Sequence, residues 1–174
     1  GSTFSGCLDS GLFSNNDEKI IVAPTWTKGD FWQYSVKTQN MEISTTMVVS
    51  IDDDATDYYV GAGSLEDAKR HAVLNHNPAL GRVQISNFAV YENNVPQNII
   101  DFPLKSDKSW SFNLYGEDFV ASVLSIIDEN TDIDISATSN SGATILYHYD
   151  TNARWFTYFQ YINSNGEILG VTYI

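Results

Sequence analysis

Residues 143–174 read ATILYHYDTNARWFTYFQYINSNGEILGVTYI, and this stretch predicts three consecutive β-strands. Large apolar and aromatic side chains alternate with polar ones, which is the pattern of half-buried strands. Asn165-Gly166 separates the last two apolar runs, and Asn-Gly is a strong signal for a tight hairpin turn. Because strands joined by short turns run in opposite directions, we expect antiparallel pairing. The expected strands cover residues 143–150, 154–162 and 167–174.

The same alternation recurs over much of the chain that precedes this stretch. Trp32 and Tyr34 alternate with polar neighbours, and Trp110 and Phe112 do the same. Clusters of Gly, Asn, Asp and Ser separate the alternating runs, as turns require. The sequence therefore predicts a mainly β fold, an antiparallel open barrel or sandwich of about 8–11 strands.

One segment departs from this alternation and predicts a helix. Ser64 is followed three residues later by Asp67, which is typical of an N-cap with an acidic residue in the first turn. Mostly helix-compatible residues follow, and Pro78 ends the run. We expect one short amphipathic helix near residues 64–77, packed on the sheet.

Length and patterning predict a single folded domain. The chain has 174 residues, of which 43% are hydrophobic, and this length is typical of one domain. We expect residues 1–18 to form a flexible N-terminal tether and residues 19–174 to form a single β domain. Residues 50–62 align without gaps with residues 125–137. This similarity predicts two related halves, and chance resemblance between two acidic hairpins is the alternative.

The charge balance excludes some partners. Nine Lys and Arg residues stand against 22 Asp and Glu residues, which gives a formal net charge of −13. Nucleic-acid binding is not expected, because a binder must neutralise phosphates with clustered basic side chains. A polybasic membrane patch is excluded for the same reason. We therefore expect membrane contact only through a lipid anchor.

The single cysteine, Cys7, follows Thr3-Phe4-Ser5-Gly6. Small residues immediately before a cysteine resemble the lipobox of prokaryotic lipoproteins, in which the cysteine sulfur carries diacylglycerol. The resemblance implies lipidation at Cys7 and an extracytoplasmic location, at the cell surface or in the periplasm. An unmodified cysteine in the tether is the alternative. One cysteine also excludes an intrachain disulfide.

Two further stretches, residues 101–110 and 147–167, are similar to segments of bacterial and archaeal cell-envelope proteins. The first contains Phe102-Pro103-Leu104 and the second ends in Asn165-Gly166-Glu167. Many such domains are lipoproteins with an incomplete β-barrel around an apolar concavity, similar to the carriers LolA and LolB. The resemblance implies this architecture for the C-terminal half of the chain. It carries no catalytic residues.

An aromatic hairpin, which runs from Tyr147 to Tyr161, is the most unusual feature of the sequence. Its rings could form the floor of a site for an apolar ligand, a sugar ring or a partner peptide. The favoured alternative is a central strand buried on both faces. We expect the helix to line or cap an apolar cavity formed by some of these rings. The candidate ligand-binding residues are Tyr147, Tyr149, Trp155, Tyr158 and Phe159.

Acidic residues offer one candidate metal site. Asp52, Asp54 and Asp57 provide clustered oxygen ligands suited to Ca²⁺. The spacing does not match an EF-hand, and a solvated acidic turn is the favoured interpretation. The same interpretation holds for the acidic residues between 128 and 134. His148 lies among tyrosines in an expected strand. We interpret it as a packed or surface side chain and not as a metal ligand, so we expect no zinc site. Beyond Ca²⁺, no cofactor is predicted.

These observations favour a non-enzymatic function. The leading hypothesis is an exported or lipid-anchored envelope domain that binds an apolar small molecule or an envelope protein. The alternative is a structural or adhesive surface domain with acidic, calcium-binding loops. A hydrolase is the third hypothesis, because a chain with 22 acidic residues always contains pairs of carboxylates. No motif singles out such a pair.

Overall fold

The computed structural model describes residues 19–51, 57–70, 81–124, 126 and 132–173. Within these residues the chain forms one antiparallel sheet of twelve strands and a short helix. The strands are β2 (Phe31–Lys37), β3 (Glu42–Ile51), β4 (Asp57–Ala62), β5 (Gly81–Gln84), β6 (Val90–Glu92), β7 (Val95–Gln97), β8 (Ser109–Leu114), β9 (Glu117–Val123), β10 (Asp132–Ser139), β11 (Thr144–Asp150), β12 (Trp155–Ile162) and β13 (Ile168–Tyr173), and the helix is α2 (Leu65–Arg70).

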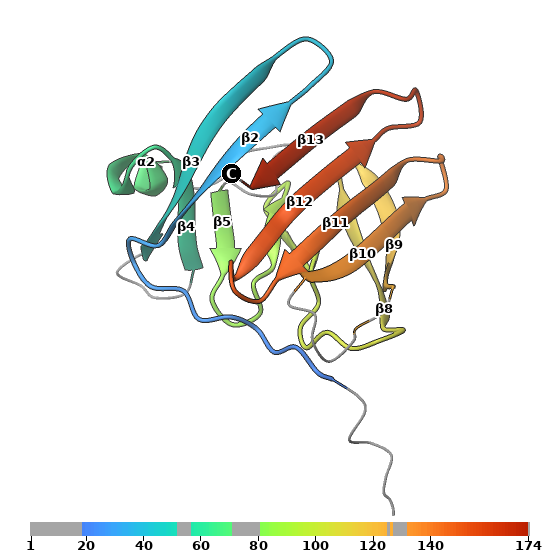
Figure 1. Cartoon of the computed structure of the whole chain (residues 1–174), viewed down its shortest axis with the longest axis horizontal. Helices are drawn as coiled ribbons and strands as arrows, with labels where there is room; N and C mark the ends of the chain where they lie inside the picture. Colours follow the sequence, from blue (N-terminus) through green and yellow to red (C-terminus); the bar gives the residue numbers. More distant parts are fainter. Residues whose placement is uncertain (1–18, 52–56, 71–80, 125, 127–131, 174) are drawn as a thin grey trace, which may run out of the picture.

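The strand order follows the chain in two runs that meet in the middle of the sheet. It is β7-β6-β5-β4-β3-β2-β13-β12-β11-β10-β9-β8. Strands β2 to β7 extend in one direction from the middle, and strands β13 back to β8 extend in the other (Figure 1). Among these pairs only β2 and β13 join strands that are distant in the sequence. The other pairs join consecutive strands.

The two end strands of the sheet, β7 and β8, face each other across a seam that side chains bridge. The backbone N–H of Asn113 donates to Oε1 of Gln97 at 2.6 Å, and Nε1 of Trp110 donates to the carbonyl of Asn98 at 2.8 Å. The N–H of Tyr115 donates to the carboxylate of Glu92. The sheet is therefore curled but is not a closed barrel, and the predicted mainly β, antiparallel class is confirmed.

An aromatic core fills the inner face of the curled sheet. Trp26 is 3% exposed, and its ring centroid lies 5.0 Å from that of Trp32 and 4.9 Å from that of Trp155. Phe88 meets Trp26 edge-on at 4.9 Å. Edge-to-face and tilted arrangements at these distances are favourable for aromatic pairs. The core therefore connects residues before β2 with the first residue of β12.

Helix α2 packs on β3 and β4 through a contact that only glycine permits. A Cβ atom at Gly61 would lie 2.3 Å from Cα of Ala68. The predicted N-cap is present, since Oγ of Ser64 accepts the N–H of Asp67 at 3.1 Å. The predicted span of 64–77 is matched at its start, and its part beyond Arg70 lies outside the described residues.

The predicted strand count was too low because β6 and β7 were not expected. Each has three residues, which is too short for an alternating pattern. Each of the two aligned segments leads into the third strand of a three-stranded unit, β2–β3–β4 in the first case and β8–β9–β10 in the second. The turn residues of both segments lie largely outside the described residues. In the first unit, Trp32 and Ala62 both pair with Met47 of β3. In the second unit, Trp110 and Ala137 both pair with Ala121 of β9.

The expected tether, residues 1–18, lies outside the described residues.

Candidate functional site

A notch opens where β2 and β13 stop pairing. Their ladder covers four residue pairs and ends at Lys37 and Gly170, and the β2–β3 and β12–β13 hairpins part beyond it (Figure 1). Two cavities of about 430 and 440 Å³ lie here, and Thr38, Gln39 and Ile168 line both of them. The notch comprises these cavities, one on the inner and one on the outer face of the sheet.

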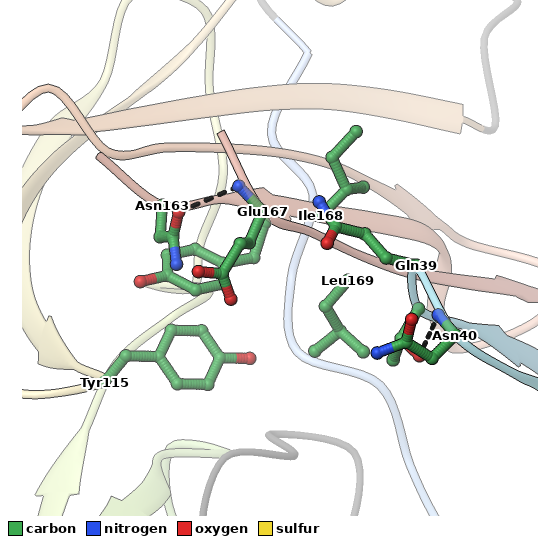
Figure 2. A pocket seen from close by; sticks show the side chains of 9 residues that line it. Gln39, Asn40, Tyr115, Asn163, Glu167, Ile168 and Leu169 are labelled. Carbon is green, nitrogen blue, oxygen red and sulfur yellow. Dashed lines mark hydrogen bonds between the residues drawn. The ribbon is translucent and has the colours of Figure 1, made fainter. Parts of the chain in front are cut away.

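The inner cavity has an aromatic and aliphatic wall. The rings of Tyr115 and Tyr161 lie 4.2 Å apart at 31°, and Leu169 completes this wall. Figure 2 shows the Tyr115 ring across the cavity from Asn163 and Glu167. Tyr115 occupies the turn between β8 and β9 with a positive φ of 55°, a conformation that is uncommon outside glycine. This turn, and not a strand, places the ring in the cavity.

Polar groups form the rim of the inner cavity. Oδ1 of Asn163 accepts the backbone N–H groups of Asn165 and Glu167, each at 2.9 Å, and this fixes the turn between β12 and β13. Gln39 and Asn40 lie on the opposite hairpin (Figure 2). An amide can both donate and accept hydrogen bonds, so this rim can orient a polar group of a ligand.

Both tyrosines of the inner cavity remain neutral near pH 7. Burial, followed by the neighbouring Tyr161 and Glu92, raises the pKa of Tyr115 far above its ordinary value. Burial, followed by the charge of Glu117, also raises the pKa of Tyr161. Among the described residues that line the inner cavity, Glu167 is the only charged side chain. The inner cavity is thus an apolar wall with a neutral to acidic rim.

Most of the predicted ligand-binding residues belong to the core. Tyr147, Tyr149, Trp155 and Phe159 are each at most 1% exposed, and the hydroxyl of Tyr147 donates to the carbonyl of Ile99. A β-bulge between positions 148 and 149 changes the pairing register here.

Two of the predicted residues line depressions in the surface. Tyr158 lies on the outer face and lines the outer cavity of the notch. Tyr149 lines a separate depression beside Ile21 and Arg154. Helix α2 packs on β3 and β4, and β2 and β13 separate these strands from the aromatic hairpin β11–β12. The expected position of the helix above this hairpin was therefore wrong.

The predicted calcium ligands are only partly described. Asp52 and Asp54 lie outside the described residues. Asp57 begins β4, where its carboxylate accepts the hydroxyl of Tyr91 at 3.2 Å and lies 3.9 Å from Nη1 of Arg82. The described contacts of Asp57 are therefore with protein groups.

His148 has carboxylate neighbours that the sequence reasoning missed. Its ring projects from the outer face of β11 and lies 3.5 Å from Asp132 and 3.3 Å from Asp134 of β10. The alternation Tyr147-His148-Tyr149 already indicated an outward histidine. The register between β10 and β11, which the sequence did not show, selects the two aspartates.

Comparisons with family models, with curated proteins and with solved structures found no match. None of the described residues belongs to a helix that could span a bilayer.

Proposed function

We propose that this protein is a non-enzymatic binding domain that takes an apolar small molecule in the notch. The observation that carries this proposal is the pair of cavities, about 430 and 440 Å³, that meet where β2 and β13 part. Small-molecule sites are typically concave and about 300–1,000 Å³ in volume.

The lining of the inner cavity favours an apolar ligand over a charged one. Tyr115, Tyr161 and Leu169 present apolar surface to the inner cavity, and Ile168, which is 43% exposed, borders both cavities. Covering such surface contributes about 25 cal/mol for each Å² removed from water. The amides of Gln39, Asn40 and Asn163 supply the few polar contacts that orient a ligand. Glu167 disfavours an anion.

Binding of N-phenyl-1-naphthylamine, a neutral probe whose fluorescence rises in apolar surroundings, tests this proposal. Ile168→Asn should weaken binding about tenfold, since a partly buried aliphatic side chain contributes roughly 1.5 kcal/mol. Leu169→Asn should also weaken binding, because Leu169 lines the inner cavity. Leu146→Asn is the matched control, because Leu146 is also exposed, at 37%, but lies on β11 outside the notch.

Two outcomes would contradict the proposal. The first is an unmutated protein that does not bind the probe. The second is equal loss of affinity in Ile168→Asn and Leu146→Asn, which would show that the probe reports general surface hydrophobicity.

We also propose that the domain acts outside the cytoplasm, held by a lipid on Cys7. The support is the run of small residues before this cysteine. Protein purified from its own host should carry a diacylglycerol mass on the peptide that contains Cys7. An unmodified thiol in that peptide would reject the anchor and leave the binding proposal intact.

A further inference from the structure

We propose that Asp132, Asp134 and His148 bind a divalent transition-metal ion of the zinc class on the outer face of β10 and β11. The three side chains offer ligand atoms that all lie within 4.8 Å of one another. None of these three residues lines the notch, although the ring of Tyr158 both contacts His148 and lines the outer cavity. The metal proposal does not rest on the binding function proposed above.

The strand register brings these side chains together. Asp134 is the direct partner of His148 in the β10–β11 ladder, and Asp132 lies two residues along the same face of β10. Nδ1 of His148 lies 3.5 Å from Oδ2 of Asp132, and Nε2 lies 3.3 Å from Oδ1 of Asp134. Neighbouring ligands of a tetrahedral zinc ion, each about 2.0–2.1 Å from the metal, are about 3.3 Å apart. One ion can take only one ring nitrogen of His148, and with one ligand atom from each residue the three atoms lie within 4.8 Å of one another. One aspartate is therefore already near the separation of zinc ligands, and the other has to move closer when the ion binds.

The neighbouring strand β12 supports the position of the imidazole. Tyr158 is the direct partner of His148 on this side, and the two rings lie 5.1 Å apart at 38°. The hydroxyl of Thr157 donates to Oδ1 of Asp132 at 3.4 Å. Partners of this kind orient metal ligands before the ion binds. The carboxylates are 48% and 49% exposed, so they are free to adjust to an ion.

The local charge balance also favours a cation. A third carboxylate, Asp150, is the direct partner of Asp132 across the ladder. None of the described Lys or Arg ion pairs involves Asp132 or Asp134. A bound dication would offset the negative charge of these three carboxylates.

The ligand types select the class of metal. Imidazole is a good ligand for zinc, nickel and cobalt, whereas Ca²⁺ and Mg²⁺ prefer oxygen ligands alone. Two carboxylates and one imidazole leave a fourth position of a tetrahedral ion for water, as in open zinc sites. We expect Zn²⁺ and Co²⁺ to bind and Ca²⁺ to bind at least tenfold more weakly.

Titration of the full chain with Co²⁺ tests this site, because tetrahedral Co²⁺ has a visible absorption band that Zn²⁺ removes by competition. One equivalent should bind. His148→Gln should weaken binding at least tenfold, and Asp134→Asn should weaken it in the same direction. The double variant His71→Gln/His76→Gln is the matched control, since it removes the other two histidines of the chain and should keep the stoichiometry.

Three results would overturn the proposal: no binding to the unmutated chain, equal binding to His148→Gln, or loss of binding in the control variant. Ca²⁺ binding as tight as Zn²⁺ binding would overturn the metal class. If His148→Gln does not fold, nuclear magnetic resonance of the unmutated chain replaces it. Co²⁺ should then shift the imidazole signals of His148 before those of His71 and His76, and the reverse order would refute the site.

Discussion

Two tryptophan side chains hold the turn between β11 and β12 from the other half of the sheet. Nε1 of Trp26 donates to the carbonyl of Arg154 at 2.9 Å, and Nε1 of Trp32 donates to the carbonyl of Ala153 at 2.6 Å. A third tryptophan, Trp155, packs against Trp26, but its Nε1 has no hydrogen-bond partner among the described residues. The indole N–H groups of Trp26 and Trp32 thus each have a carbonyl acceptor, whereas that of Trp155 has none among the described residues.

This difference predicts that the same substitution costs more stability at Trp32 than at Trp155. Trp32 is 2% exposed and Trp155 is 1% exposed, so replacement by Phe removes similar buried volume at both. Trp32→Phe also leaves a carbonyl without its donor, whereas Trp155→Phe removes an unpaired N–H. We expect the free energy of unfolding to fall about 1–3 kcal/mol more in Trp32→Phe. Urea unfolding measures the difference, and equal losses would show that volume alone decides the outcome.

An ion pair near the same turn predicts acid sensitivity. Nη1 of Arg154 donates to Oδ2 of Asp30 at 2.7 Å. Burial raises the pKa of Asp30, but the hydrogen bonds from Arg154 and Thr27 and the charge of Arg154 outweigh it and hold the pKa below its ordinary value. The stabilisation is therefore fully present above the pKa of the unfolded carboxyl, about 3.9, and is lost as the pH falls through the lower folded value.

Asp30→Asn should lower the free energy of unfolding at pH 6 and flatten its decline below pH about 4. The variant and the unmutated protein should converge at the acidic end. Urea unfolding at a series of pH values measures this. Arg154→Gln should flatten the same part of the profile, and a profile unchanged in either variant would contradict the assignment.

At the scale of elements, the contact between α2 and β4 leaves no room for a side chain at Gly61. Gly61→Ala should push the helix from the sheet and destabilise the protein by about 1–3 kcal/mol, the usual cost of overpacking. Gly170→Ala is the control, because a Cβ atom there would meet only a backbone oxygen at 3.9 Å. Thermal unfolding compares the two variants. Equal effects would mean that α2 moves away without cost.

The sequence predicted long strands well and short ones poorly. The expected strand 154–162 matches Trp155–Ile162, since many alternating residues and flanking turns define it. Strands of three residues, such as Val95–Gln97, hold no detectable period. The notch could not be predicted from the sequence either, but for a different reason. It depends on where β2 leaves β13 and on a turn that carries Tyr115, and both depend on pairing between distant parts of the chain.

At the scale of the whole molecule, side-chain acceptors connect the two ends of the sheet. Gln97 accepts the N–H of Asn113 across the seam at 2.6 Å. Gln97→Met keeps a similar shape but leaves this N–H without its acceptor, which costs about 1–3 kcal/mol when the group is buried. We expect faster hydrogen exchange at the Asn113 amide than in the unmutated protein.

The control for this substitution is Gln33→Met, at an exposed position of β2. Amide exchange followed by nuclear magnetic resonance should show no change at Asn113 in that variant. Unchanged exchange in Gln97→Met as well would show that the seam does not depend on this side chain.

The pairing of β2 with β13 also has a consequence for synthesis on the ribosome. Every other pair in the described sheet joins strands that are consecutive in the chain, so most of the sheet can assemble while translation proceeds. Strand β2 has β3 on one side, but its other edge has no partner until β13 has emerged. Unpaired strand edges invite pairing with other chains. The nascent chain is therefore exposed to aggregation along β2 for most of its synthesis, and chaperones that cover strand edges would act there.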